Sequence, residues 1–241
     1  MKKKTIIYSL ILILLITVIF ILVGLIKQYE KSGNANVLVI PDDQGLGQQA
    51  EALEENQKTS VINFNLIPYP SNYNFAQTYN DCGPFNTAAV VRALTGENVS
   101  SADFAKTITH RIKYKWTLPE GLTEQLNLYG VTTETPDLSE LSEYEKASYL
   151  REQIALQHPV ILLIKKENFQ HYITLFGFDT AKDEFYIYDS LMARDKDGLT
   201  KDENGDLPGN KTITTDKLLK SWSGGGMLGK YTWFAIVSSY K

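Results

Sequence analysis

The apolar and polar positions divide the chain into an apolar N-terminal run, a polar segment and a region with periodic apolar residues. Residues 5–26 carry no charge and follow three lysines at positions 2–4. At about 1.5 Å per residue, this run spans roughly 30 Å, the thickness of a bilayer core. Turn-forming and polar residues then predict a stalk or linker over 27–60. The pattern of a folded domain covers 61–241, after a membrane anchor at 1–26.

A cleaved signal peptide is the alternative for the apolar run. The apolar part of a signal peptide is usually about 7–15 residues long and ends at a cleavage site with small residues. Here the run is longer, and Gly24-Leu25-Ile26-Lys27 is a poor cleavage site. We therefore expect a single-pass membrane protein. The N-terminal lysines favour a cytoplasmic N-terminus and an extracytoplasmic domain.

The first half of the domain has the periodicity of helices. The apolar run 82–94 leaves little polar surface and predicts a mostly buried helix with Pro84 in its first turn. Cap and stop signals predict three more helices. The first covers about 101–109. The second begins with a capping box at Thr117–Glu120 and ends at Gly130, and the third covers about 142–157.

The second half of the domain has the patterns of strands. Residues 160–164 form a continuous apolar run, and 171–178 and 184–189 are joined by a short polar link, which predicts a hairpin. A short helix near 216–222 and a strand at 231–238 complete the prediction. Helices followed by antiparallel strands favour an α+β fold.

Composition narrows the function classes. The apolar content of 43% and charged content of 22% are typical of a globular protein. A net charge of −4, without a basic cluster beyond the N-terminus, argues against nucleic-acid binding. The acidic loop 195–206 does not have the spacing of a twelve-residue calcium loop, so we expect a solvated loop and no metal or cofactor.

The chain contains one cysteine, Cys82, at the start of the predicted helix 82–94. In an exported domain a single cysteine has no intramolecular disulfide partner, which makes it a candidate reactive thiol. A cysteine nucleophile reacts as the thiolate, a form that a helix N-terminus stabilises. The alternatives are a small buried apolar residue and a redox sensor that pairs with another chain.

Cysteine catalysis also needs a base in contact with the thiol. Among the three histidines, His158 precedes a proline in a predicted turn, and His110 lies beside Arg111 in a basic segment that we expect to be solvated. His171 begins a predicted strand, whose end can present a side chain to a cleft. We therefore choose His171 as the base, with a structural histidine as the alternative.

An acid that orients the base is predicted at Asp189, directly after an aromatic run where a carboxylate without a partner is unexpected. If Phe178 pairs with Glu184, Asp189 is the diagonal neighbour of His171, roughly 7–8 Å away at Cα. A slip of one residue would move Asp189 to the other face. A turn-capping role is the alternative for this residue.

Acyl transfer further needs donors for the developing oxyanion. The backbone N–H of Cys82, at the start of the predicted helix, is one candidate. The side-chain amide of Gln77, shortly upstream, is the other. An ordinary loop amide is the alternative for Gln77.

Three motifs together resemble the bacteriocin-leader-processing peptidases, papain-like cysteine peptidases that include stand-alone, membrane-anchored members. They are Gln77-x4-Cys82-Gly83-Pro84, His171-Tyr172-Ile173-Thr174-Leu175-Phe176-Gly177-Phe178-Asp179 and Tyr188-Asp189-Ser190. The resemblance covers roughly residues 67–237. It implies a papain-like fold with Cys82 as nucleophile, His171 as base, Asp189 as its orienter and Gln77 as oxyanion donor. Two departures are the serine after the acid, where the family often has proline, and a Gln-to-Cys spacing one residue short of some members.

The sequence therefore predicts a membrane-anchored, extracytoplasmic cysteine peptidase that acts on a peptide or protein substrate. The same residues on the same scaffold can support amidase or transpeptidase chemistry. A catalytically silent module that presents a papain-like cleft for binding is an alternative of a different class.

Overall fold

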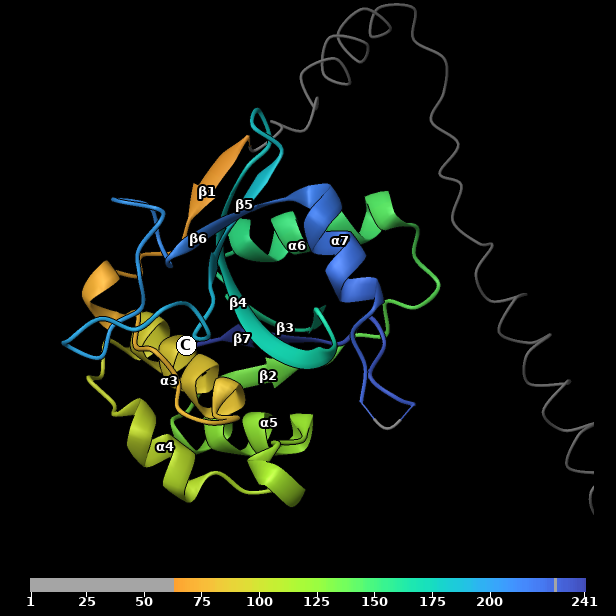
Figure 1. The fold of residues 1–241 in the computed structure, drawn as a ribbon. Coiled ribbons are helices and arrows are strands. Elements are labelled where there is room, and N and C mark those ends of the chain that lie inside the picture. The colour runs from red at the N-terminus through yellow and green to blue at the C-terminus, as the bar shows by residue number, and fades with distance from the viewer. Residues whose placement is uncertain (1–62, 228) are drawn as a thin grey trace, which may run out of the picture. The chain divides into compact units, whose positions relative to one another are not determined.

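The computed structural model of the chain describes residues 63–227 and 229–241, shown as the coloured ribbon in Figure 1. The predicted anchor (1–26) and stalk (27–60) lie outside the described residues. Within the described part, no helix combines the length and the apolar composition that a membrane span requires.

The helices of the described residues fall close to their predicted positions. The sequence pattern did not indicate two short 3-10 turns, Ser71–Tyr73 and Lys113–Lys115. The helices are α3 (Cys82–Thr95), α4 (Ser101–Thr107), α5 (Pro119–Leu128), α6 (Glu143–Ala155) and α7 (Thr215–Ser223).

The predicted capping box at Thr117–Glu120 is wrong. Helix α5 begins at Pro119 after Leu118, which has an extended backbone and makes no side-chain cap. Proline has a φ angle suited to the first helical position, which moves the start of the helix one residue past the predicted one. The carboxylate of Glu120 instead accepts a 2.6 Å hydrogen bond from the Tyr231 hydroxyl. The capping box of this domain lies at α6, between Ser142 and Glu145.

The strands form one antiparallel sheet in the order β2-β7-β3-β4-β5-β6, and β1 pairs with the end of β4. The sequence pattern missed three of them, each only three or four residues long. The last strand begins at Ala235 rather than at 231, because Tyr231 and Trp233 have positive φ angles. The strands are β1 (Phe64–Leu66), β2 (Thr132–Glu134), β3 (Val160–Lys166), β4 (Phe169–Asp179), β5 (Glu184–Tyr188), β6 (Lys211–Thr214) and β7 (Ala235–Ser239).

The β4–β5 hairpin changes register once along its length. At the turn Phe178 pairs with Phe185, not with Glu184, so the predicted pairing is wrong there. An irregularity between Leu175 and Gly177 shifts the register by one residue. Beyond it Thr174 pairs with Tyr188, which is the predicted register. The hairpin therefore approaches Asp189 on the predicted face.

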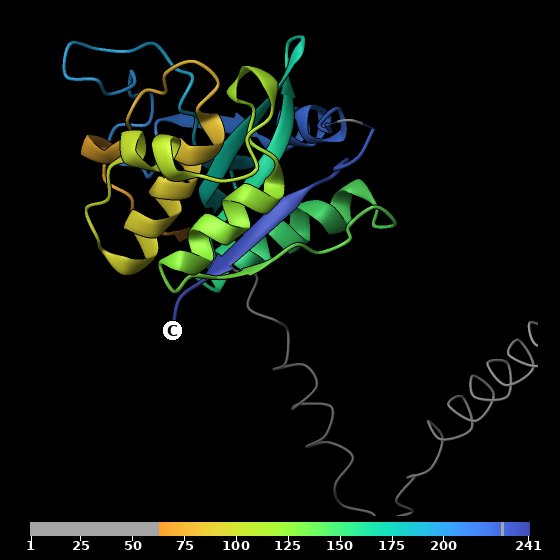
Figure 2. The same cartoon turned by 90° about the horizontal axis from the view of Figure 1, so that it is seen from below.

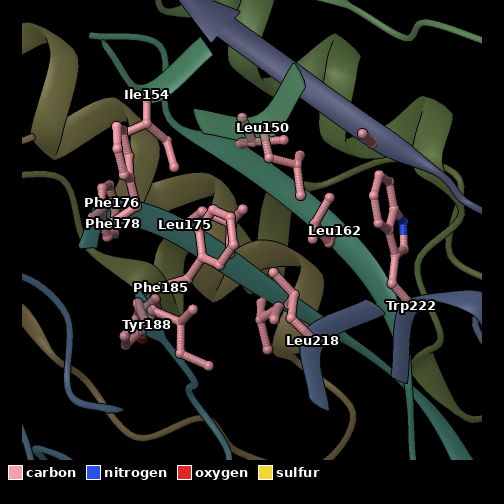
Figure 3. Close-up of a cluster of buried hydrophobic side chains, with 14 of the residues drawn as sticks. Leu150, Ile154, Leu162, Leu175, Phe176, Phe178, Phe185, Tyr188, Leu218 and Trp222 are labelled. Atoms are coloured by element: carbon pink, nitrogen blue, oxygen red, sulfur yellow. The ribbon is translucent and has the colours of Figure 1, made fainter. Parts of the chain in front are cut away.

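Helices cover both faces of the sheet. Figure 1 shows α3, α4 and α5 together on one side and α6 and α7 on the other, and the turned view in Figure 2 shows the same division. The side of α6 and α7 holds the larger cluster of buried side chains, in which Trp222 donates a 3.0 Å hydrogen bond to the carbonyl of Phe234. Figure 3 shows this cluster, with Leu150 and Ile154 from α6 and Trp222 from α7 among its members. The arrangement confirms the predicted α+β fold class.

Candidate active site

Cys82 is the first residue of α3 and lines a groove of ≈ 370 Å³. Gln77, Phe169, His171 and Leu191 line the same groove. A backbone N–H at the first position of a helix has no acceptor within that helix. The N–H of Cys82 is therefore suited to bind an anion in this groove. The thiol itself lies at the helix end that stabilises negative charge.

Asn86 fixes the helix that begins at Cys82 to the strand that carries His171. Its Nδ2 donates 2.8 Å hydrogen bonds to the carbonyls of Cys82 and Tyr172. Its Oδ1 accepts a 2.7 Å hydrogen bond from the Thr174 hydroxyl. The side chain is fully buried, so these contacts hold the start of α3 against β4. The sequence carried a signal for this role, a polar residue within the apolar run 82–94 and one turn after Cys82.

His171 and Asp189 form a buried pair. The Nε2–H of His171 donates to Oδ1 of Asp189 at 2.8 Å. The side chains are only 1% and 4% exposed. The backbone N–H of Leu191 donates to the same oxygen at 2.9 Å, and Lys166 binds the other oxygen at 2.6 Å. Because Nε2 is used by Asp189, the Nδ1 atom of His171 is the ring nitrogen left for the Cys82 thiol.

The three side chains are coupled electrostatically. Burial alone would raise the pKa of the Cys82 thiol, but the hydrogen bond and positive charge of His171 lower it below its usual value. Burial alone would lower the pKa of His171, yet hydrogen bonds to Asp189 and Cys82 raise it to about 9. Burial also opposes the charge on Asp189, but His171 and Lys166 hold the pKa of its carboxyl well below its usual range. These shifts favour a thiolate–imidazolium pair near neutral pH.

Gln77 lies at the edge of the same groove. Its backbone N–H donates to the carbonyl of Ser190 at 2.8 Å, and its Oε1 accepts a 2.8 Å hydrogen bond from the Ser190 hydroxyl. With Oε1 occupied in this way, the Nε2 of Gln77 is the end of the amide available to a ligand in the groove. The structure thus brings all four predicted site residues together. The serine after Asp189, noted as a departure from the family pattern, contacts Gln77.

Asn210 supports Asp189 through the backbone, a role that sequence reasoning missed. Its Oδ1 accepts a 2.8 Å hydrogen bond from the Asp189 N–H, and its Nδ2 donates to the Asp189 carbonyl at 2.9 Å. The preceding Gly209 has a φ of 76° and passes so close to Ile187 that a Cβ would lie 2.2 Å from its carbonyl oxygen. A separation of more than twenty residues from Asp189 gave no local signal for this contact.

The acidic loop 195–206 is only partly solvated, whereas the sequence predicted a solvated loop. Its charged side chains between Asp195 and Asp206 are exposed, but Asn204 is buried and donates to the carbonyl of Pro208 at 2.9 Å. The loop also hydrogen-bonds to the segment before Gln77, because the N–H of Ala76 donates to the carbonyl of Gly198 at 2.9 Å. It therefore packs along the chain that carries the site.

The expectation of a solvated Arg111 is wrong. Its guanidinium lies 2.7 Å from Oδ1 of Asp81, the residue before Cys82, and donates to the carbonyl of Asn80 at 3.1 Å. The Asp81 carboxylate is buried, and a buried carboxylate needs a charged partner. His110 remains near the surface, as expected, where it contacts Glu124 at 2.8 Å. Arg111 thus anchors the loop that leads into α3.

A family model matches the chain over residues 61–207, more than half of its length. The model is that of the Peptidase_C39 like family, and the match includes all four predicted site residues. The chain belongs to the Peptidase_C39 like family. This membership confirms the predicted resemblance at the level of the family and its papain-like α+β peptidase fold.

Solved structures of peptidase domains are also similar to this chain. One is the peptidase domain of Streptococcus ComA, a bifunctional ABC transporter of a quorum-sensing pathway, with 18% identity, a TM-score of 0.43, and coverage of 73% of this chain and 98% of the other. Another is a double-glycine-motif protease from an AMS/PCAT transporter in complex with the leader peptide, with 15% identity, a TM-score of 0.47, and coverage of 73% of this chain and 95% of the other. No curated protein matches the sequence.

The Peptidase_C39 like match ends at residue 207, before Asn210. The support that Asn210 gives to Asp189 therefore comes from a part of the chain that the family model does not cover. The catalytic roles of the four residues, the stand-alone character of the chain and its membrane anchor stay predictions.

Proposed function

We propose that this member of the Peptidase_C39 like family is a cysteine peptidase that hydrolyses peptide or amide bonds with Cys82, His171 and Asp189. One observation carries the proposal. The buried ring of His171 binds the Asp189 carboxylate at 2.8 Å through Nε2, while its other side contacts the Cys82 thiol. A nucleophile, a base and a group that orients the base are the parts that thiol catalysis requires.

The geometry supports a sequence of proton transfers around one acyl-enzyme. The Cys82 thiolate attacks the substrate carbonyl carbon and forms a C–S bond, while the negative charge moves to the carbonyl oxygen. The imidazolium of His171 then gives its proton to the leaving amine as the C–N bond breaks. In the second half, neutral His171 takes a proton from water as the water oxygen attacks the thioester carbon. The C–S bond then breaks, which releases the carboxylic acid and restores the Cys82 thiolate beside the His171 imidazolium.

Two donors of this chain are available for the oxyanion. The N–H of Cys82 points from the helix start, and the Nε2 of Gln77 is free on the groove side because Ser190 binds Oε1. Donors fixed before the reaction stabilise the charge as it develops in the transition state. We propose that Gln77 and the Cys82 backbone serve together in this role.

We further propose that the enzyme is anchored in a membrane by residues 1–26, with a cytoplasmic N-terminus and an extracytoplasmic peptidase domain. The support is in the sequence: an uncharged run at 5–26 long enough to cross a bilayer, preceded by three lysines. Its substrate would then be a peptide or protein outside the cytoplasm. Accessibility of engineered cysteines at positions 2 and 240 in a Cys82→Ala background would test the orientation, and labelling of position 2 from outside would contradict it.

The reaction class is tested by incubating the full-length chain with a peptide library, with and without an added amine. The proposal expects cleaved peptides whose new carboxyl ends carry oxygen from labelled water. The blank is the same chain alkylated at Cys82, its only cysteine. Products joined to the amine without hydrolysis would replace the peptidase with a transpeptidase, and binding of peptides without any turnover would favour a silent module.

A further inference from the structure

Lys166 is the last residue of β3 and pairs across the hairpin with Phe169. Two residues earlier, Ile164 pairs with His171. Because side chains of a strand alternate between faces, Lys166 and His171 project from the same face of this hairpin. The ammonium of Lys166 reaches the Asp189 carboxylate from there, at 2.6 Å from Oδ2.

The two oxygens of Asp189 therefore have different partners. Oδ1 accepts from His171 and from the N–H of Leu191, while Oδ2 binds Lys166. Asp189 is 4% exposed and Lys166 is 26% exposed, so the ion pair is largely protected from solvent. A mostly buried ion pair is screened much less than one at the surface.

We propose that Lys166 is a positioning residue of the active site, whose charge fixes the Asp189 carboxylate and limits how strongly that carboxylate stabilises the His171 imidazolium. This inference rests on the proposed function, because it concerns the same catalytic set. Lys166 acts through Asp189 and does not itself contact the thiol or the reacting atoms.

The physical reason lies in the sign of each charge. A carboxylate beside an imidazolium favours the protonated ring, whereas a cation on the far oxygen of that carboxylate disfavours it. Lys166 also holds Oδ2, which prevents the carboxylate from turning away from Nε2. The chain thus combines a well-oriented His171 with an imidazolium that can still give up its proton, as both halves of the reaction require.

Few other charges face this ring. The titratable groups around His171 are Cys82 from α3 and Asp189 after β5. Phe169 of the same strand is uncharged, and the centroid of its ring lies 6.4 Å from the centroid of the His171 ring. Glu167, in the turn between β3 and β4, is exposed to solvent. Lys166 is therefore the residue whose removal should change the charge balance at His171.

The single cysteine provides a substrate-independent test. The rate at which iodoacetamide alkylates Cys82 in the full-length chain is measured by intact mass from pH 4 to 11. In the wild type we expect the alkylation rate to reach a plateau over the pH range in which the thiolate is paired with the imidazolium. The rate should then rise a second time, at higher pH, when His171 loses its proton. In Lys166→Met this upper transition should move to higher pH by about 0.5 to 1 unit, as expected from the loss of one nearby charge.

Matched variants separate charge from structure. Lys166→Arg keeps the charge and should keep the wild-type profile, and Lys165→Met removes the neighbouring lysine on the opposite face and should also keep it. Lys166→Gln, which is polar and uncharged, should shift as Lys166→Met does and replaces it if the latter does not fold. An upper transition that stays in place or falls in the uncharged variants, or one that moves equally in Lys165→Met, would overturn the inference.

The outcome is distinguishable from failure of the proposed function. If the wild type cleaves peptides but the transition does not move, only the role of Lys166 is lost. If the upper transition of the alkylation profile moves but no amide bond is cleaved or transferred, the proposed peptidase function is rejected. The effect of Lys166 on the His171 ring then still stands.

Discussion

The Nε2 atom of His171 lies 2.8 Å from Oδ1 of Asp189, and both side chains are almost completely shielded from water. This contact leaves one direction for the other ring nitrogen, toward Cys82 at the start of α3. It also places an anion where it stabilises a positive ring. The pH range in which a thiolate and an imidazolium coexist therefore depends on Asp189.

Replacing Asp189 with asparagine should narrow this pH range at both ends. The carboxylate helps to raise the pKa of His171 to about 9, so its loss should lower that pKa and move the basic limb of kcat/KM to lower pH by about one unit or more. The acidic limb, which the thiol sets, should move to higher pH, because a less populated imidazolium stabilises the Cys82 thiolate less. A pH–rate profile on a cleaved peptide measures both limbs. A basic limb that stays near pH 9 would contradict the coupling.

Gln77→Ala should lower kcat by about 10²-fold, with a smaller effect on KM, because the proposed role of the amide is to bind the oxyanion of the transition state. Gln77→Glu should be as damaging, since an ionised carboxylate accepts hydrogen bonds but donates none. The measurement is steady-state kinetics on one peptide. Equal kcat values for the wild type and both variants would remove Gln77 from the mechanism.

Ser190→Ala should also lower kcat, but by less, because it removes the hydroxyl that binds the Oε1 atom of Gln77. If Ser190 acts through this amide, the serine variant should have little further effect in a Gln77→Ala background. A double-mutant cycle of kcat measures this coupling. Additive effects in the cycle would show that Ser190 contributes independently of Gln77.

Arg111→Met should destabilise the domain by about 3 kcal/mol, because it leaves the buried Asp81 carboxylate without its charged partner. Chemical unfolding followed by circular dichroism measures the free energy of unfolding. Lys113→Met, a change at an exposed neighbouring lysine, is the matched control and should alter stability by less than about 0.5 kcal/mol. An Arg111 variant as stable as this control would mean that Asp81 does not depend on the guanidinium.

In the β4–β5 hairpin, the sequence predicted the strand pairing near Asp189 correctly but not the pairing at the turn. The polar link after Phe178 was recognised, but the pairing there is offset by one residue. The irregularity at Leu175–Gly177 restores the predicted register before Asp189. The alternation of apolar and polar side chains did not predict this irregularity. The predicted proximity of His171 and Asp189 therefore depended on a feature visible only in the folded hairpin.

Contacts between distant segments account for most of what the sequence did not predict. Arg111 stands among lysines and a histidine, a context typical of a solvated face, and its partner is thirty residues away. Asn210 follows a glycine in a polar loop and reaches Asp189 only through the folded sheet. Local patterns pointed to the candidate site residues, whereas the residues that hold them in place are recognised by tertiary contacts.

The most direct test compares the cleavage of one peptide by the full-length wild type and by Cys82→Ala, with circular dichroism to establish that both are folded. Cys82 is the proposed nucleophile, so the account predicts a fall in kcat/KM on the order of a thousandfold or more. Equal cleavage by the two folded proteins would contradict the account.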